Sequence, residues 1–497
     1  MEKRDIAQLI IARLDGQDIN KRFSYYRSLV KCGIGGFIVF GGRAAKVRDG
    51  IKKLQSEATF PLFIASDLEQ GLGQQIDGGT VFPPAMAIAS AIDINNKDDK
   101  MLLGDVIDTI AIEAKAVGVN VILAPVADVL TNPDNPIICT RSFSDDPKVV
   151  GWFVREYVRG IQRHGLIACA KHFPGHGDTS VDSHIAVPTV SADMERLKDI
   201  ELYPFRMAIK AGVRMVMIGH LMVPAMDKRL STFSKGIVTG LLREEMGFKG
   251  LVITDAMTMR AVYEHGDEAY VMAIKAGADI ILHPDSPHRV IDLLYKRRGM
   301  IYTDIERALV NIIKTKGILK PEFKDIRYIG RKSHVELSKR VTNEALRIDQ
   351  WHLSRIRDAL SDYDNLALLV IDDDNNRSGW TLYRSLKMVF KRLVYFYVDN
   401  KPNGGLDGIL SSIKGKPIII AVYSRVSAYK GRVFLSRRLT SFLKRAINLA
   451  RISIVIGFCC PYGIKDLSGD VLINAYSDRG MSEGCVAELL LSTFKND

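Results

Sequence analysis

The chain has 497 residues, of which 47% are hydrophobic and 25% are charged, and its formal net charge is +12. This length exceeds one ordinary domain and fits two, and the composition is that of a globular protein. No apolar stretch approaches the roughly 20 residues that a membrane-spanning helix needs. No known nucleic-acid-binding motif accompanies the basic residues, which recur at helical spacing and indicate solvated helix faces. We therefore expect neither membrane insertion nor nucleic-acid binding.

The first residues and the cysteines indicate in which cellular compartment the protein is expected. The chain begins Met1-Glu-Lys-Arg-Asp-Ile6, which is charged and lacks the apolar core of a signal peptide. Six cysteines are scattered, mostly within apolar runs, and are typical of small buried hydrophobes rather than a disulfide framework: Cys32, Cys139, Cys169, Cys459, Cys460 and Cys485. Together these features predict a cytoplasmic location.

The first two thirds of the chain alternate apolar, strand-like runs with amphipathic, helix-like stretches. Eight runs are predicted strands: Leu9–Leu14, Gly35–Phe40, Leu62–Asp67, Val119–Ala127, Leu166–His172, Met215–His220, Leu251–Asp255 and Ile280–His283. Strands that alternate with helices in this way predict an α/β fold, here a (β/α)8 barrel of the TIM type, whose usual size is about 250 residues.

A second alternation follows a predicted boundary near Pro321 to Ser338. Its predicted strands are Leu366–Ile371, Leu393–Val398, Pro417–Tyr423, Ile452–Phe458 and Val471–Tyr476. We expect residues 1–335 to form the barrel and residues 336–497 to form a smaller C-terminal α/β sandwich domain.

Polar side chains recur where the predicted barrel strands end, which is the face that carries the active site in barrel enzymes. One such residue alone is more often a strand-end cap or part of a loop salt bridge. Recurrence at five places indicates a polar site at the barrel mouth: Asp67, Asp128, Arg141, His220 and Asp255.

The densest group of titratable residues is KHFPGHGDTSVDSH, Lys171 to His184, directly after the predicted fifth strand. Its imidazoles and carboxylates could be metal ligands, but their spacing matches no zinc pattern. Gly175-His-Gly177 lacks the Lys-Ser/Thr that follows in a phosphate loop. The alternative is a polar site in which Asp182, two residues before His184, raises the pKa of that imidazole and makes it a general acid.

This stretch resembles the signature of glycoside hydrolase family 3, and specifically of its β-N-acetylglucosaminidase branch. The family's β-glucosidases differ after the Lys-His pair and lack the Asp-Ser-His element. Further blocks resemble the family at APVADV, NPDNP with RSF, IGH, STFSKGIVTGLLREEMGFKG and VITDAM. The resemblance implies a catalytic barrel followed by an α/β sandwich, and a carbohydrate substrate. Because the sequence contains no ligand set with metal spacing, we expect no metal requirement, and we expect no cofactor.

The resemblance also implies roles for individual residues. Asp255 falls at the position of the nucleophile, and His184 at that of the acid/base, assisted by Asp182. The family holds the hydroxyls of the terminal sugar at five places, which here are Asp67, Asp128, Arg141, Lys171 and His172. His176 falls where the family shapes the loop and the site.

One segment departs from the family pattern. The glucosaminidases usually carry Asp-Gln-Glu-Gly-Gly-Arg with a second Arg soon after, whereas this chain reads DLEQGLGQQ from Asp67 to Gln75. Gln75 falls at the place of a sugar-contacting Arg, and an amide lacks the guanidinium fork and its charge. The exact glycan specificity is therefore left open.

The resemblance implies a retaining glycoside hydrolase that removes terminal β-linked N-acetylglucosamine, with cell-wall (peptidoglycan) fragments as the expected substrates. An imidazole acid repels an incoming anion less than a carboxylate does, so phosphate could replace water as the acceptor. Three alternatives stay open: a β-glucosidase or β-xylosidase of the same family, a glycoside phosphorylase, and a barrel that only binds sugar. The sequence does not predict the oligomeric state or the role of the C-terminal domain.

Overall fold

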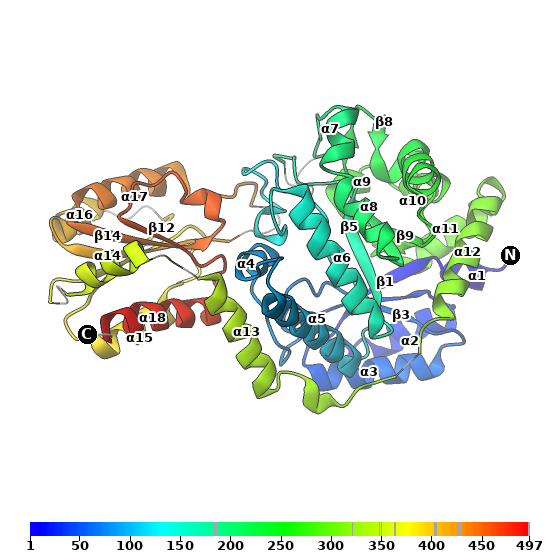
Figure 1. Cartoon of the computed structure of the whole chain (residues 1–497). Helices are drawn as coiled ribbons and strands as arrows, with labels where there is room; N and C mark the ends of the chain where they lie inside the picture. The colour runs from blue at the N-terminus through cyan, green and yellow to red at the C-terminus, as the bar shows by residue number, and fades with distance from the viewer. Residues whose placement is uncertain are drawn as a thin grey trace. The chain divides into compact units, whose positions relative to one another are not determined.

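The computed structural model describes residues 1–181, 187–320, 322–346, 348, 350–361, 364–401, 405–425 and 430–495. The chain forms two compact units, one of residues Met1–Phe82 with Met101–Ser338 and one of Pro83–Lys100 with Lys339–Asp497. Figure 1 labels their helices and strands. The domain boundary between residues 335 and 336 stays a prediction.

Eight parallel strands form the centre of the first unit: β1 (Ile10–Asp15), β2 (Gly36–Phe40), β3 (Phe63–Ser66), β4 (Val121–Ile122), β5 (Ile167–Phe173), β6 (Met215–Ile218), β9 (Leu251–Thr254) and β10 (Ile281–Leu282). Neighbouring strands follow each other in this order, and β10 also pairs with β1. A parallel bridge between Ile253 and Ile280 joins β9 to β10 and closes the barrel. The (β/α)8 fold class is thus confirmed, and each of the eight predicted runs overlaps a strand.

Helices surround these strands because each has one apolar face. In α6 (Pro147–Arg163) the side chain of Asp146 accepts a hydrogen bond from the Lys148 N–H, which caps the first turn, and the buried face packs on β5. The other described helices of the first unit are α1 (Lys3–Ala7), α2 (Phe23–Lys31), α3 (Ala44–Glu57), most of α5 (Lys97–Val117), α7 (Met194–Asp199), α8 (Tyr203–Lys210), α9 (Arg260–Tyr263), α10 (Glu268–Ala276), α11 (Pro287–Arg297) and α12 (Tyr302–Lys316). Helix α13 (Lys332–Ala345) is divided between the two units after Ser338. Figure 1 shows α3, α5 and α6 on the outside of the strands.

The connection from β6 to β9 differs from the others. It contains a short antiparallel hairpin, β7 (Met222–Val223) and β8 (Asp227–Leu230), followed by a π-helix at Gly236–Glu245. This π-helix occupies the crossover position between two neighbouring parallel strands, where a barrel ordinarily has an α-helix.

The strand register determines which side chains point into the barrel. Phe37 packs on Tyr26 of α2, with ring centroids 5.8 Å apart, so it faces outward and its neighbour Ile38 faces inward. Residues that pair across neighbouring strands point to the same face of the sheet. Arg13 of β1 and Ala65 of β3 both pair with Ile38, so they also face inward. Extending the pairing round the barrel gives further inward residues near its carboxyl end, among them Arg13, Asp15, Phe40, Asp67, Lys171 and Asp255.

The second unit is built on a five-stranded parallel sheet in the order β12-β11-β13-β14-β15. Its strands are β11 (Ala367–Asp372), β12 (Val394–Asp399), β13 (Pro417–Ser424), β14 (Ile452–Cys459) and β15 (Val471–Asn474). Both faces are covered, one by α16 (Leu406–Ile413) and α17 (Arg437–Leu449), the other by α14 (Gln350–Ser361), α15 (Trp380–Val389) and α18 (Gly480–Lys495) (Figure 1). Helix α4 (Ala85–Ala91) also belongs to this unit. The predicted α/β sandwich is confirmed.

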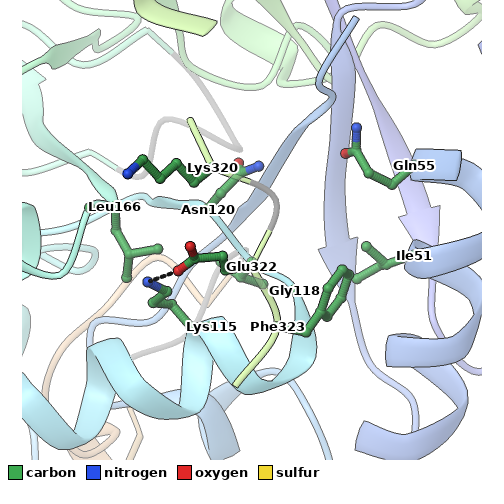
Figure 2. Close-up of a pocket in the computed structure, with 11 residues that line it drawn as sticks. Ile51, Gln55, Lys115, Gly118, Asn120, Leu166, Lys320, Glu322 and Phe323 are labelled. Atoms are coloured by element: carbon green, nitrogen blue, oxygen red, sulfur yellow. Dashed lines mark ion pairs between the residues drawn. The ribbon is translucent and has the colours of Figure 1, made fainter. Parts of the chain in front are cut away.

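A small pocket opens at the amino ends of the barrel strands, shown in Figure 2. Asn120 and Leu166, which precede β4 and β5, line it together with Phe323, and Lys115 forms an ion pair of 3.8 Å with Glu322. It therefore lies at the opposite end of the barrel from Asp67 and Asp255. None of the helices that the structure describes has the length and hydropathy to cross a membrane.

Candidate active site

Four charged side chains form a connected network at the barrel mouth. Lys171 Nζ donates a hydrogen bond of 2.7 Å to Asp67 Oδ1 and lies 2.7 Å from Glu69 Oε1. Arg141 binds the same glutamate through Nε and Nη2, at 2.9 Å from Oε2 and 2.8 Å from Oε1. The network brings together three residues predicted from the sequence, Asp67, Arg141 and Lys171, although Asp67 and Lys171 lie 104 positions apart.

Glu69 holds this network and was not among the predicted site residues. Burial opposes its ionisation, but Arg141 and Lys171 outweigh that cost and hold its pKa well below the usual value. Burial likewise opposes the charge on Lys171, yet Asp67 and Glu69 raise the pKa of its ammonium above the ordinary value. Lys171 is therefore a charged, almost fully buried donor, with 2% of its side chain exposed.

Asp128 lies beneath two imidazoles and is fully buried. Its carboxylate accepts hydrogen bonds from the Nδ1 of His172 at 2.8 Å and from the backbone N–H of His176 at 2.7 Å. The His172 backbone N–H also approaches it, at 3.2 Å. This arrangement fixes the tautomer of His172, whose Nε2 remains for another partner.

His176 is buried beside His172, with ring centroids 5.9 Å apart. Burial lowers its pKa to about 4, so the ring is neutral near pH 7. Its Nδ1 lies 2.8 Å from Thr179 Oγ1, while Nε2 is a buried nitrogen without a hydrogen-bond partner in the described part of the chain.

Asp255 follows the last residue of β9 and faces inward. Its backbone N–H donates to the Ile218 carbonyl at 3.0 Å, and its Oδ1 accepts the Ala256 N–H at 2.7 Å. Burial opposes ionisation of this carboxyl, but His172, His220, the Ala256 N–H and Lys171 outweigh it and lower the pKa below its ordinary value. Asp255 is therefore an ionised carboxylate at the barrel mouth.

His220 supports the loop after Asp255. Its Nε2 donates to the Ala256 carbonyl at 3.2 Å, and its Nδ1 lies 2.6 Å from Thr232 Oγ1. Burial lowers the pKa of this imidazole. A neutral ring with its proton on Nε2 satisfies both contacts and fixes the backbone next to the carboxylate.

The predicted acid/base pair, Asp182 and His184, lies outside the described residues. The chain before it is held by Asn135, whose Nδ2 donates to the His176 carbonyl at 2.7 Å, and by Asp178, which pairs with Arg196 of α7 at 2.8 Å. Gln75, at the predicted departure from the family, is partly exposed after a short 3-10 turn, Leu72–Gln74.

A cavity of about 330 Å³ adjoins the loops that follow β9 and β10. Met257, two residues after Asp255, lines it together with Tyr263 and Tyr270. It therefore provides space beside the carboxyl end of β9.

Comparison with known proteins agrees with this geometry. Residues 3–312, more than half of the chain, match the model of the glycosyl hydrolase family 3 N terminal domain. The matched family is one of glycosyl hydrolases, and the matched residues include all eight strands of the barrel. The chain belongs to glycoside hydrolase family 3, and the resemblance to its β-N-acetylglucosaminidase branch is confirmed.

Several relatives carry names from this branch. The chain is 36% identical over 247 residues to "Beta-hexosaminidase A" of Pseudoalteromonas piscicida, a match that covers 46% of this chain and 41% of that protein. It is 34% identical to "Beta-N-acetylglucosaminidase/beta-glucosidase" of Cellulomonas fimi, over 54% of this chain and 48% of that protein. A "Beta-hexosaminidase" of Xylella fastidiosa is 32% identical over 57% of this chain and 84% of its own length. The chain thus spans less than half the length of the first two relatives.

Solved structures extend the likeness to both units. A glycoside hydrolase family 3 β-N-acetylglucosaminidase from Paenibacillus sp. str. FPU-7 is similar with a TM-score of 0.81 and 26% identity, over 99% of this chain and 97% of that one. The β-glucoside phosphorylase BglX is similar with a TM-score of 0.83 at 21% identity, over 99% of this chain and 92% of that one. Because the identity to this phosphorylase is only 21%, the similarity shows a shared fold alone.

Proposed function

We propose that the chain is a retaining β-N-acetylglucosaminidase that removes terminal β-linked N-acetylglucosamine from glycans. The observation that carries this proposal is Asp255, an ionised carboxylate that faces into the mouth beside the Lys171 network. The names of the relatives, β-hexosaminidases and a β-N-acetylglucosaminidase, support the choice of sugar.

In the proposed reaction, Asp255 attacks the anomeric carbon and forms a glycosyl-enzyme ester as the bond to the leaving oxygen breaks. His184, held charged by Asp182, donates a proton to that oxygen. In the second step His184 takes a proton from water, whose oxygen attacks the anomeric carbon and releases Asp255. A low pKa suits Asp255, because a nucleophile must be ionised and must leave readily in the second step.

The remaining site residues would bind and orient the sugar. Lys171 and Arg141 present charged donors, and Asp67, about a quarter exposed, presents an acceptor. His172 would accept a hydrogen bond from a sugar hydroxyl at Nε2, because its bond to Asp128 holds the ring proton on Nδ1. Because both oxygens of Asp128 already accept protein donors, we assign it to positioning His172 and His176.

A panel of aryl β-glycosides tests the activity and the sugar together. We expect kcat/KM for the N-acetylglucosaminide to exceed that for the glucoside and the xyloside, and the first-formed product to keep the β configuration. Equal or reversed preference would contradict the proposed sugar. The same assay with phosphate distinguishes hydrolysis from phosphorolysis, since only the latter yields a sugar phosphate.

Cell-wall (peptidoglycan) fragments are the proposed natural substrates, and the cytoplasm is the proposed location. All six cysteines are unbridged, and five of them are buried, as suits a reducing compartment. Release of N-acetylglucosamine from purified muropeptides, together with fractionation of the native cells, tests both proposals. Activity confined to chitin-type chains, or recovery outside the cytoplasm, would overturn them.

A further inference from the structure

Strand β12 forms an open edge of the five-stranded sheet. It pairs with β11 on one side, and no other strand in the described part of the chain pairs with it. The Val394 N–H donates to the Leu366 carbonyl at 3.2 Å, so the backbone groups of Val394 are directed toward β11. Successive residues of a strand direct these groups to opposite sides. Phe396 is therefore also bonded toward β11, whereas Tyr395 and Tyr397 direct their N–H and C=O groups away from the sheet.

This edge lacks the features that ordinarily prevent edge pairing, which are charged side chains, proline, bulges and short length. The run Leu393–Val398 contains no charged residue, proline or glycine, and the register of β12 with β11 is continuous over its six residues. The opposite edge strand, β15, has only four residues. Val394 is 43% exposed, and Tyr395, Phe396 and Tyr397 are half-buried. The edge is thus accessible to a further strand.

The sequence of β12 is complementary to itself. Val394-Tyr-Phe-Tyr-Val398 reads the same in both directions. A two-fold axis brings the same surface of two copies together, and it relates two paired strands as antiparallel neighbours. With the axis at Phe396, Tyr395 lies opposite Tyr397 of the second copy, and Phe396 lies opposite Phe396.

The direction of the backbone groups agrees with this register. An antiparallel ladder needs residues with outward backbone groups to stand opposite each other. Tyr395 and Tyr397 meet this condition, since both direct their backbone groups away from β11. The two strands would then form about four hydrogen bonds between these tyrosines, two for each pair.

The side chains match on both faces of the paired strands. Tyr395 and Tyr397 pack on the core beneath α14, α15 and α18, whereas Phe396 and Val398 pack on the core beneath α16 and α17. Pairing in this register places tyrosines of both copies together on the first face and Phe396 against Phe396 on the second. Aromatic pairs across neighbouring strands stabilise a sheet.

Side chains beside β12 extend this surface. Trp380 of α15 is 56% exposed, and its ring lies 5.4 Å from that of Tyr383, which lies 4.6 Å from the ring of Tyr395. Arg392 precedes the strand and Asp399 ends it. Antiparallel pairing brings the basic end of each strand to the acidic end of the other, whereas parallel pairing would place like charges together.

We propose that the chain forms a two-fold dimer through antiparallel pairing of β12 with β12 of a second copy. The two sheets of the second units then continue into one another, and both exposed edges are closed. The partner is a second copy because the strand that best matches Val394–Val398 in the reverse direction is that strand itself.

Opposite charges placed on the two-fold axis test this register. Sedimentation equilibrium of the full chain over a concentration series should show a reversible monomer–dimer equilibrium. Phe396→Lys and Phe396→Glu should each weaken self-association roughly tenfold or more, because two like charges then face each other. An equimolar mixture of the two variants should recover association by a similar factor, because Lys then lies opposite Glu.

Phe60→Lys is the matched control, since Phe60 is also 43% exposed but lies in the first unit. It should leave the dimer unchanged. The proposal is wrong if the wild type stays monomeric at every concentration, if the mixture recovers nothing, or if both lysine variants have the same effect. Growth into larger assemblies in place of a closed dimer would exclude two-fold pairing.

Hydrogen exchange of the wild-type chain tests the same register without any substitution, so it does not depend on the folding of a variant. The outward amides of Tyr395 and Tyr397 should exchange slowly at concentrations where the chain is dimeric and roughly tenfold faster or more on dilution. The Phe396 amide, which is bonded toward β11, should change little. Equal exchange of the two tyrosine amides at all concentrations would overturn the proposal.

Discussion

Replacement of Glu69 by Gln should destabilise the barrel mouth and slow turnover. The wild-type carboxylate accepts two hydrogen bonds from Arg141, at 2.9 and 2.8 Å, and pairs with Lys171 at 2.7 Å, while only 9% of its side chain is exposed. Breaking a buried ion pair from one side costs about 3–5 kcal/mol. An amide oxygen retains part of the hydrogen bonding, so we expect a loss of about 3 kcal/mol.

Thermal and denaturant unfolding near pH 7 measure this loss, which corresponds to a fall of roughly 3–5 °C in Tm. The pKa of Glu69 is lowered in the folded state, so its ionised carboxylate stabilises the fold fully above pH 4.5, the ordinary pKa of the group. This stabilisation is lost as the pH falls below that value toward the lowered pKa. The difference between wild type and Glu69→Gln should therefore shrink on acidification. We expect kcat/KM to fall at least tenfold, because the change leaves Arg141 and Lys171 without their shared carboxylate.

Glu57→Gln is the control for this experiment. Glu57 pairs with Arg27 at 2.6 Å, but that pair joins α2 and α3 at the surface, where an ion pair contributes about 0–1 kcal/mol. If Glu69→Gln changes stability and activity no more than Glu57→Gln does, the network does not organise the site and the reasoning is refuted.

Three further predictions follow from the assigned roles. His184→Ala should lose most activity with sugar or alkyl leaving groups and least with a good phenolate leaving group, and azide should restore its turnover. Asp255→Ala should be severely impaired with every leaving group. If His184→Ala loses activity equally with all leaving groups, the assignment of the two roles is wrong. Lys171→Met should lower kcat/KM roughly 10- to 150-fold, as expected for the loss of one charged hydrogen bond to a sugar hydroxyl, and near-normal activity would make Lys171 structural. Burial lowers the pKa of Lys316 from 10.5 to about 7. Between pH 7 and 10.5 the unfolded chain therefore binds more protons than the folded chain, and the free energy of unfolding should rise with pH. The rise should reach up to about 1.4 kcal/mol per pH unit. Denaturant unfolding of wild type and Lys316→Met at pH 7, 8 and 9 checks this, and parallel pH profiles would exclude it.

The barrel strands were predictable because strands of a parallel sheet are buried on both faces and appear as short apolar runs. All seven residues of β5 are buried, including the polar Lys171 and His172 at its end. The β7–β8 hairpin was not predicted, since each of its strands is very short and β8 reads Asp-Lys-Arg-Leu. Neither was the grouping of residues 83–100 with the second unit, because it depends on contacts distant in the sequence.

The site residues likewise divide into those that the sequence predicts and those that only the folded chain reveals. Residues at strand ends could be identified one by one, and the barrel topology brings Asp67, Arg141 and Lys171 together as expected. The role of Glu69 could not be derived, because its partners lie 72 and 102 positions away and only the folded chain joins them. Its position two residues after Asp67, on the same loop, was the one signal available.

The central claim is that Asp255 forms the covalent bond to the sugar, and trapping that intermediate tests it most directly. A 5-fluoro N-acetylglucosaminyl fluoride should accumulate as a glycosyl-enzyme, and trypsin should release the label on the peptide Gly250–Arg260, GLVITDAMTMR. Asp255 is the one carboxylate side chain in that peptide, so its mass identifies the attachment site. The account predicts a single label there, absent from Asp255→Ala. A label on any other peptide, or turnover of the reagent without a covalent adduct, would contradict it.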